Sequence, residues 1–333
     1  MKRIHLYFRK PPEKDRYLPG DRYIFLAARK LFRPKKISGI EKVFINLRLG
    51  FDEIGVNYVV NRPFKEIAPG EPVVVLGIGK QALEGYNKPN PIIAGIALVS
   101  HPTQWPTMCQ DFPVVKYLQH SKWANDIYIP YYGADVCELW PAGIETQKWL
   151  PEKDKKPVYD VLIYNKIRWD YPKMEVELIE AIKNKLKALG LSFVEICYGH
   201  YQEADYHELL KQSRSMIFLS EHESQGFACC EALSMDIPVY AWDQTHWLDP
   251  ERHQWGTPDI SASSVPFFDD TCGMTFKNYA TFETGLSTFW EKVTQQQFSP
   301  RDYILKNITL EKSARRMLEI IQEVYDKPAT KTL

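Results

Sequence analysis

The feature that most constrains the fold is an alternation of short apolar runs with longer helical stretches. The runs are rich in β-branched residues and mostly continuous, which is typical of strands buried on both faces of a parallel sheet. The clearest helical stretch is Met174–Leu189, with apolar residues at helical spacing and Gly190 as a stop signal. This alternation predicts an α/β fold with helices on both faces of its sheets. The runs are Ile4–Phe8, Val56–Val60, Val73–Leu76, Ile92–Val99, Val158–Tyr164, Phe193–Cys197, Met216–Leu219 and Pro238–Trp242.

Composition limits the class of protein. Of 333 residues, 44% are hydrophobic, and 42 Lys and Arg balance 42 Asp and Glu, which excludes a disordered, collagen-like or disulfide-scaffold chain. The longest apolar run, Ile92–Val99, is far shorter than the roughly 20 residues of a membrane-spanning helix. The first residues lack the apolar core of a secretory signal, and the six cysteines form no C-x-x-C pair. We therefore expect a cytoplasmic protein with reduced thiols and no structural metal.

A polar stretch with prolines at both ends, Pro151–Pro157, predicts a domain boundary because a new apolar run follows it directly. We expect an N-terminal domain over 1–150, a C-terminal domain over 151–315, and a C-terminal helix and tail over 316–333. Two α/β domains of this size each build a core and place a ligand cleft at the carboxyl ends of their strands.

The charge balance conceals a basic N-terminal region. Residues 1–48 hold 14 Lys and Arg but only 4 Asp and Glu, so the arm at 9–37 favours an anionic partner. Its segment Arg22–Lys36 fits a basic amphipathic helix, which either lies in a membrane interface or packs its apolar side on the domain. Liposome flotation with and without residues 9–37 tests a peripheral membrane contact, which failure to float at low salt excludes.

The segment Met216–Asp243 carries the most chemistry. It reads as a strand, a polar turn, a helix and a strand, with Glu223 in the turn and Glu231 in the helix. Gly226 lets the backbone approach a ligand where the helix begins, and the free N–H groups there favour a phosphate. Glu231 is placed to accept hydrogen bonds from the two hydroxyls of a ribose. The alternative is a capped helix with two solvated or ion-paired glutamates.

This segment resembles the retaining glycosyltransferases of the GT-B fold, also called glycosyl transferase group 1 or family 4. The family signature is an E-x7-E motif followed by a Pro-Val strand. Asp236 replaces the family's glycine before that strand, which affects the turn, and Gln225 replaces a phenylalanine, which alters the expected sugar contact. The residues that match in register are Ser220, Glu223, Gly226, Glu231, Ala232, Pro238 and Val239.

A second match follows the first strand of the C-terminal half. The family carries G-R-L-x-x-x-K-G there, and its Arg and Lys hold the nucleotide diphosphate. Arg168 and Lys173 keep this spacing, although Ile167 stands where the family has glycine. Arg suits a bidentate contact with phosphate, and Lys supplies a point charge. Alone, such a pair is usually ordinary surface.

Fainter matches lie in the first half. Gly39 and Glu41 resemble the family's G-G-x-E helix start, although only one glycine is present, and Leu139–Trp149 resembles the segment before the hinge. His101 follows an apolar run where the family often has a histidine near the sugar; a structural histidine is the alternative. Phe227 and Gly199 complete the donor-binding set that the resemblance implies.

The resemblance implies two Rossmann-like doubly wound domains facing across a cleft. It also implies transfer of a sugar from a nucleotide-diphosphate sugar to a hydroxyl acceptor, lipid-linked or polysaccharide, with retention of configuration. The expected catalytic residues are Glu223, Arg168, Lys173 and His101. The expected donor-binding residues are Glu231, Gly226, Phe227, Gln225, Gly39 and Gly199. No cofactor is expected, and no metal, because the sequence has no D-x-D motif.

Other functions stay open at this stage. A catalytically silent GT-B scaffold binds nucleotide, glycan or a partner enzyme without turnover, and a nucleotide-sugar epimerase gives product without an acceptor. A nucleic-acid-binding module would leave the glutamate and Arg/Lys motifs unexplained, so we expect no nucleic acid partner.

Overall fold

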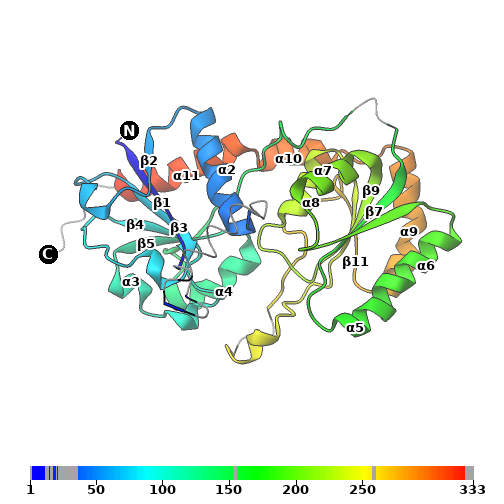
Figure 1. Ribbon diagram of the computed structural model, residues 1–333, viewed down its shortest axis with the longest axis horizontal. Helices are drawn as coiled ribbons and strands as arrows, with labels where there is room; N and C mark the ends of the chain where they lie inside the picture. The colour runs from blue at the N-terminus through cyan, green and yellow to red at the C-terminus, as the bar shows by residue number, and fades with distance from the viewer. Residues whose placement is uncertain are drawn as a thin grey trace. The chain divides into compact units, whose positions relative to one another are not determined.

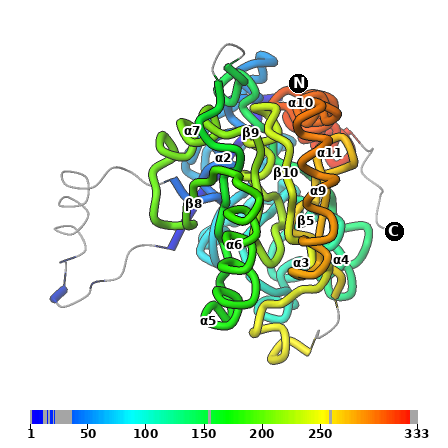
Figure 2. Tube along the Cα trace, turned by 90° about the vertical axis from the view of Figure 1, so that its right-hand side faces the viewer, coloured from blue at the N-terminus to red at the C-terminus, as the bar shows by residue number. Residues whose placement is uncertain are grey.

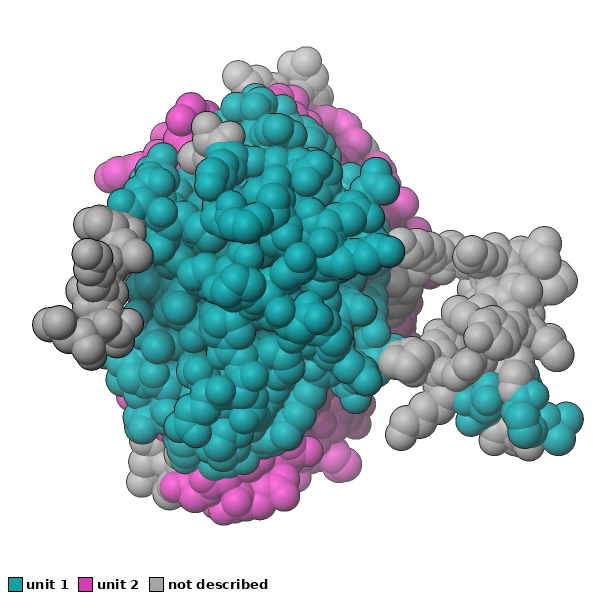
Figure 3. Space-filling view, turned by 90° about the vertical axis from the view of Figure 1, so that its left-hand side faces the viewer, with its two compact units in different colours: residues 1–118, 129–138, 316–333 teal, residues 119–128, 139–315 magenta. Residues whose placement is uncertain are grey.

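A computed structural model describes residues 2–11, 15, 18–19, 21, 37–152, 156–256 and 260–326 of the chain. The chain divides into two compact units, coloured separately in Figure 3. Unit 1 comprises residues 1–118, 129–138 and 316–333, and unit 2 comprises residues 119–128 and 139–315. The predicted basic helix Arg22–Lys36, with most of the basic arm, lies outside the described residues.

Unit 1 is built on a six-stranded sheet with the strand order β2-β1-β3-β4-β5-β6. The pairs from β2 through β5 are parallel, as the continuous apolar runs predict. Figure 1 draws this sheet in blue to cyan-green. Its strands are β1 (Ile4–Arg9), β2 (Tyr58–Val60), β3 (Val73–Ile78), β4 (Ile92–Ala97), β5 (Val114–Gln119) and β6 (Cys137–Leu139), and the helices of this part of the chain are α2 (Gly39–Glu53), α3 (Met108–Asp111), α4 (Lys122–Tyr132) and α11 (Leu310–Tyr325).

Unit 2 is built on a five-stranded parallel sheet with the strand order β11-β10-β9-β7-β8. Its strands are β7 (Tyr159–Asn165), β8 (Phe193–Cys197), β9 (Ser213–Leu219), β10 (Val239–Trp242) and β11 (Gly273–Phe276). Its helices are α5 (Tyr171–Met174), a π-helical segment (Glu175–Glu180), α6 (Ala181–Ala188), α7 (Glu203–Gln212), α8 (Phe227–Ser234), α9 (Tyr279–Thr294) and α10 (Pro300–Asn307).

Helices cover both faces of the unit 2 sheet. Alternate residues of β7 and β9 point to opposite faces: Ile163 and Ile217 pack with α6 and α9, whereas Leu162 and Met216 pack with α7, α8 and α10. Figure 1 shows α6 and α9 on one side of β7 and β9, with α7 and α8 on the other. Figure 2 looks onto the α6–α9 layer. Burying each large apolar side chain in these layers contributes about 1.5–3 kcal/mol.

The strand order of unit 2 reverses between β7 and β9. From β7 the chain moves outward to β8, then returns to the other side of β7 and continues through β9, β10 and β11. At such a switch point the loops leave neighbouring strands in opposite directions, and a crevice opens at the carboxyl ends of the strands. The topology therefore predicts that a ligand site lies at the segments that follow β7 and β9.

The predicted α/β fold with two doubly wound parallel sheets is confirmed, and each of the eight predicted apolar runs contains a strand. Three strands, β5, β6 and β11, were not predicted. The predicted helix Met174–Leu189 covers the π-helical segment, α6 and the last residue of α5, which begins earlier, at Tyr171; its Ile182 and Leu186 are fully buried.

The unit boundaries differ from the boundary predicted at Pro151–Pro157, because residues 139–150 are assigned to unit 2. Side-chain bonds explain this assignment: the indole of Trp140 donates to the carbonyl of Ser313 at 3.0 Å, and Gln225 bonds the backbone of Ala142. All six cysteines are free thiols. No helix in the described ranges combines the length and apolar character that crossing a membrane requires.

Candidate functional site

Two loops meet at the carboxyl edge of the unit 2 sheet, at the switch point. The β7 loop (residues 166–170) follows β7, and the β9 loop (residues 220–226) follows β9. Because β7 and β9 are paired in parallel, with Asn165 opposite Leu219, both loops begin at the same height on the sheet. Lys166 Nζ lies 2.5 Å from Glu223 Oε1, and the two side chains are 13% and 12% exposed. A carboxylate and an ammonium are thus brought together by topology.

Glu223 is held from several directions. Its backbone N–H donates to the carbonyl of Ser263 at 2.9 Å, and its backbone carbonyl accepts from the indole of Trp123 at 3.0 Å. Its Oε1 accepts from the hydroxyl of Ser220 at 2.9 Å as well as from Lys166. No described residue donates a hydrogen bond to its other oxygen, Oε2. The side chain is therefore fixed through one oxygen, which leaves the second for a ligand hydroxyl.

Glu221 joins the two loops. Its side chain is 3% exposed, and its Oε1 accepts from the backbone N–H groups of Arg168 at 2.6 Å and Trp169 at 3.0 Å. A carboxylate that accepts two backbone N–H bonds replaces the regular secondary structure that the β7 loop lacks. Glu221 therefore fixes the backbone that carries Arg168.

His222 packs between two tryptophans beside this carboxylate. Its ring centroid is 5.3 Å from that of Trp123 and 5.2 Å from that of Trp169. Burial lowers the pKa of His222 to about 4, and the nearby Glu223 carboxylate opposes that shift while Arg168 and Lys166 add to it. The imidazole is thus neutral at pH 7. Asp249 also opposes the shift, so four charged side chains act on this ring.

Arg168 and Lys166 share an aromatic neighbour, whereas Lys173 has a different environment. The Lys166 ammonium and the Arg168 guanidinium lie 4.7 and 5.5 Å from the ring centroid of Tyr198, which is 48% exposed. Lys173, on α5, has a side chain 57% exposed, 4.0 Å from Glu177. Of the two predicted diphosphate-binding cations, the structure therefore places Arg168 over the Tyr198 ring beside Lys166, and it places Lys173 in a surface ion pair.

Gly226 and Phe227 lie where α8 begins. Gly226 caps the helix in the left-handed region, with φ at +70°, and an added Cβ would lie 3.4 Å from Cβ of Glu223. A glycine is favoured here for its backbone conformation. Phe227 is the first residue of the helix. Gly199 lies in the turn after β8, with φ at +90°, one residue beyond Tyr198.

The side chain of Gln225 bonds to protein backbone. It is 4% exposed; its Oε1 accepts from the N–H of Ala142 at 2.9 Å, and its Nε2 donates to the carbonyl of Ala142 at 3.1 Å. This pair of bonds ties the β9 loop to the segment before β7. The residue predicted to contact the sugar therefore has a structural partner for each end of its amide.

Glu231 is buried in α8, with 4% exposure. Burial, and after it the Glu231 carboxylate, raise the pKa of Tyr206 well above its usual value. Glu231 and Glu223 both contribute to the raised pKa of the Cys230 thiol, after the larger effect of burial. The two carboxylates of the E-x7-E motif thus both act on Cys230 in α8, and Glu231 lies on the buried side of that helix.

His101 and Gly39 belong to unit 1. His101 is fully buried after β4; its Nδ1 lies 2.8 Å from the hydroxyl of Thr103, and its ring meets that of Tyr131 edge-on at 5.6 Å. Burial lowers the pKa of His101. Gly39 is the first residue of α2, and a side chain there would meet open space.

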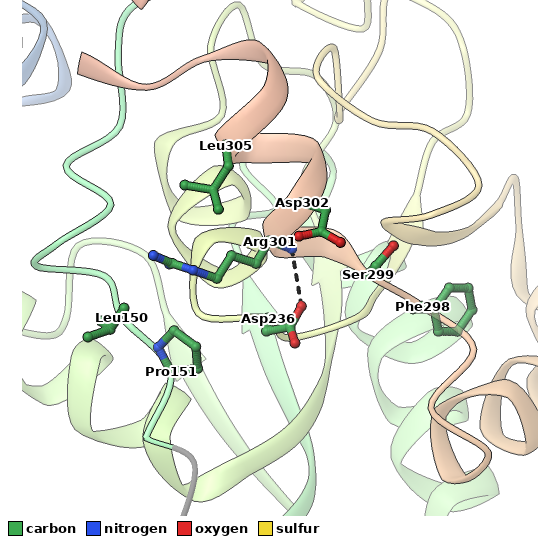
Figure 4. Close-up of a pocket in the computed structure, with 8 residues that line it drawn as sticks. All are labelled: Leu150, Pro151, Asp236, Phe298, Ser299, Arg301, Asp302 and Leu305. Carbon is green, nitrogen blue, oxygen red and sulfur yellow. Dashed lines mark hydrogen bonds between the residues drawn. The ribbon is translucent and has the colours of Figure 1, made fainter. Parts of the chain in front are cut away.

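Unit 2 has a hollow of about 630 Å³ at the opposite edge of its sheet from Lys166 and Glu223 (Figure 4). It is lined in part by Asp236, which precedes β10, and by Arg301 on α10. The Arg301 guanidinium donates to the backbone carbonyls of Ser234, Trp149 and Thr146. Because its cation is used within the fold and the hollow lies at the amino ends of the strands, it is a poorer ligand site than the switch point.

Sequence reasoning missed Lys166, Glu221 and Trp169. Their partners lie about 50 residues away along the chain, on the neighbouring strand, and no spacing within either segment reveals that pairing. The one available signal was position, since all three lie within five residues after the end of a buried apolar run. Among the described residues no group of three or more His, Cys, Asp or Glu side chains is arranged to hold a metal ion.

Comparisons with solved structures show which fold this is. A glycosyltransferase involved in avilamycin A biosynthesis, AviGT4, matches with a TM-score of 0.59 at 12% identity, over 98% of this chain and 99% of that chain. The lipopolysaccharide outer core galactosyltransferase WaaB, in its apo form, matches with a TM-score of 0.53 at 11% identity, over 96% and 100%. The chain has the GT-B fold.

A third GT-B structure that matches is the pneumococcal O-GlcNAc transferase GtfA in complex with UDP and GlcNAc. Its TM-score is 0.52 at 12% identity, over 84% of this chain and 60% of that chain. No model of a protein family matches the chain, and no curated protein matches it in sequence. At identities this low the likeness concerns the fold, and the function is argued from the site.

Proposed function

We propose that the chain is a glycosyltransferase that moves a sugar from a nucleotide-diphosphate sugar to a hydroxyl acceptor, with retention of configuration and without a metal ion. The observation that carries this proposal is the ion pair of Lys166 with Glu223 at the switch point of a parallel sheet, with Arg168 over the same Tyr198 ring as Lys166. This edge is where doubly wound sheets bind nucleotides. The resemblance of Met216–Asp243 to the E-x7-E segment supports the same assignment.

The positive charges of the β7 loop suit the departing diphosphate. As the bond from the anomeric carbon to the phosphate oxygen breaks, negative charge grows on the diphosphate and positive charge on the sugar ring. Arg168 and Lys166 stabilise the first charge, together with the start of α8 at Gly226 and Phe227. The acceptor oxygen then bonds the anomeric carbon, and its proton leaves to the diphosphate. Arg168 and Lys166 thus supply the positive charge that a metal ion supplies in metal-dependent sugar transferases.

The two glutamates of the motif have separate tasks. Oε2 of Glu223 accepts from a hydroxyl of the donor sugar, while Ser220 and Lys166 hold Oε1 in place. Glu231, further along α8, accepts from the ribose hydroxyls. Lys173 and Gly199 stay predicted donor contacts, and His101 and Gly39 stay predicted contacts from unit 1. The proposed setting is cytoplasmic, with a lipid-linked or polysaccharide acceptor.

The first experiment identifies the donor. Thermal-shift measurements with UDP-, GDP-, ADP- and TDP-sugars find the nucleotide that stabilises the protein, and release of the nucleoside diphosphate then measures turnover with candidate acceptors. Proton NMR of the new glycosidic linkage reports its configuration. Binding without release indicates a silent scaffold, and a changed sugar without acceptor indicates an epimerase. Inversion of configuration contradicts the retaining mechanism.

Glu223→Gln tests the role of the carboxylate. We expect turnover to fall at least about 100-fold, because the amide lacks the charge that responds to the developing positive ring, while the folded protein keeps its thermal stability within a few degrees. Glu138→Gln is the matched control, since Glu138 forms a similar ion pair with Lys116 in unit 1 at 2.8 Å. Unchanged turnover in Glu223→Gln contradicts the proposal.

A further inference from the structure

The ion pair between Lys166 and Glu223 stands at the point where the donor would bind. Both side chains are almost nine-tenths buried, and Lys166 Nζ lies 2.5 Å from Oε1. Removing one partner of such a pair leaves a charge without compensation, unless another group takes its place. The pair is therefore sensitive to any ligand charge that arrives beside it.

Each partner has a second support that remains when the pair is broken. Glu223 Oε1 also accepts from the Ser220 hydroxyl at 2.9 Å. The Lys166 ammonium lies 4.7 Å from the ring centroid of Tyr198, a distance at which a cation is attracted to an aromatic face. An ammonium has three N–H donors, and Glu223 uses one of them. When the ion pair breaks, Glu223 therefore keeps the Ser220 hydroxyl as a partner, and Lys166 keeps the Tyr198 ring.

The charges around the pair favour an exchange when a diphosphate arrives. Arg168 and Lys166 lie over the same Tyr198 ring, so two positive charges are near one carboxylate. A diphosphate is attracted by both cations and repelled by Glu223. The ammonium therefore gains a stronger partner in the diphosphate than in the carboxylate.

We propose that Lys166 is a shared cation that binds Glu223 in the empty site and turns to the diphosphate when the donor binds, which frees Glu223 for the sugar. This inference rests on the proposed function. It makes Glu223 a competitor of the diphosphate and a partner of the sugar, so that a nucleoside diphosphate without its sugar binds less tightly than the intact donor.

The test is a double-mutant cycle on binding of a nucleoside diphosphate, measured by calorimetry with the base that the donor screen identifies. We expect Glu223→Gln to tighten binding of the diphosphate roughly 3- to 10-fold, because Lys166 is released. We expect Lys166→Met to weaken it at least about 30-fold. In the Lys166→Met background, Glu223→Gln should tighten binding less than it does in the wild type, because only the direct repulsion by Glu223 is then relieved.

The second arm uses the intact nucleotide sugar. Glu223→Gln should weaken its binding while tightening that of the diphosphate, since the sugar loses its acceptor oxygen. A purely structural role for the pair predicts the same direction for both ligands. Lys166→Arg keeps the charge and should recover most of the lost diphosphate affinity.

The control pair is Lys116 and Glu138, which are each 17% exposed and 2.8 Å apart in unit 1. Neither Glu138→Gln nor Lys116→Met should change diphosphate affinity. If the wild type binds none of the four nucleoside diphosphates, the proposed function fails. If it binds one, but Glu223→Gln does not tighten binding, or tightens it equally with Lys166→Met in place, the shared-cation inference is overturned while the proposed function stands.

Discussion

Asp236 is one of the residues at which this chain departs from the E-x7-E family signature, and its backbone conformation explains why the departure is tolerated. Asp236 stands where the family has glycine, and its φ is +62°, in the left-handed region. Asp is among the few residues that tolerate this conformation. Its carboxylate also accepts from the backbone N–H of Arg301 at 3.2 Å, the dashed line of Figure 4. The turn is kept with a different residue, which is why the substitution leaves the motif in register.

Substitutions at Asp236 separate these two contributions. We expect Asp236→Ala to lower the free energy of unfolding by about 1–2 kcal/mol, because alanine is strained at this φ and the bond to α10 is lost. Asp236→Gly loses the same bond without the strain and should cost less than alanine. Urea unfolding of the two variants measures the difference. Equal stability of the alanine and glycine variants contradicts the strain argument.

The hydrogen-bond partners of Gln225 could not be predicted from its place in the motif. A glutamine in place of an aromatic residue next to a predicted sugar site indicates a new ligand contact. The structure instead uses both ends of its amide on Ala142, a segment more than 80 residues earlier in the chain. Only the folded arrangement reveals that partner.

At the scale of elements, the site depends on two irregular loops that are fixed to each other. Glu221, Lys166 and the ring pair of His222 with Trp169 join the β7 loop to the β9 loop. Neither loop has the regular backbone hydrogen bonds of a helix or a sheet, so these side chains determine the conformation of both loops. The position of Arg168 therefore depends on the Glu221 carboxylate, which accepts from its backbone N–H.

Glu221→Ala tests this dependence. The backbone N–H groups of Arg168 and Trp169 lose their acceptor, so we expect their hydrogen exchange to speed up at least about tenfold. The rest of the β7 loop should follow, while α9 stays unchanged. Hydrogen exchange measured on peptides from 160–175 and 279–294 reports both. Unchanged exchange of the β7 loop contradicts the role assigned to Glu221.

Elements differ in how well the sequence predicts them. The eight long apolar runs all contain strands, because burial on both sheet faces requires continuous apolar residues. The strands that escaped prediction are interrupted by charged residues, polar residues or glycine: β5 contains Lys116, β6 contains Glu138, and β11 contains Gly273 and Thr275. The E-x7-E segment was recognisable because strand, loop and helix are contiguous. The partners of its glutamates were not, since they come from other strands.

At the scale of the whole molecule, buried imidazoles link stability to pH. His120 is 3% exposed, and its Nδ1 donates to the carbonyl of Trp140 at 3.0 Å. Burial lowers the pKa of His120 from 6.5 to about 4, partly opposed by that carbonyl. In the unfolded chain the same group keeps the higher pKa. Its contribution is fully present above pH 6.5 and is lost as the pH falls toward 4.

This linkage predicts acid sensitivity. Between pH 7.5 and 4.5 we expect His120 alone to lower the free energy of unfolding by on the order of 2–3 kcal/mol. His120→Gln keeps a donor for the Trp140 carbonyl but has no proton to gain, so its stability should fall less over this range. Urea unfolding of both proteins at the two pH values gives the difference. An equal fall in both proteins contradicts the assignment.

The charged residues of the proposed site come from one of the two units. The GT-B fold supplies two parallel sheets, and every contact described between Lys166, Arg168, Glu221 and Glu223 lies within unit 2. The charged residues of the proposed diphosphate site therefore all belong to unit 2. Its hollow at the opposite sheet edge, beside Asp236 and Arg301, offers an alternative place for a ligand.

A crystal structure of the protein soaked with the nucleoside diphosphate that binds it decides between these places. We predict phosphate oxygens within hydrogen-bond distance of Lys166 Nζ and the Arg168 guanidinium, with Glu223 parted from Lys166. Density for the diphosphate at the amino edge of the sheet, or a Lys166 still paired to Glu223 with no phosphate beside it, contradicts the proposed binding site.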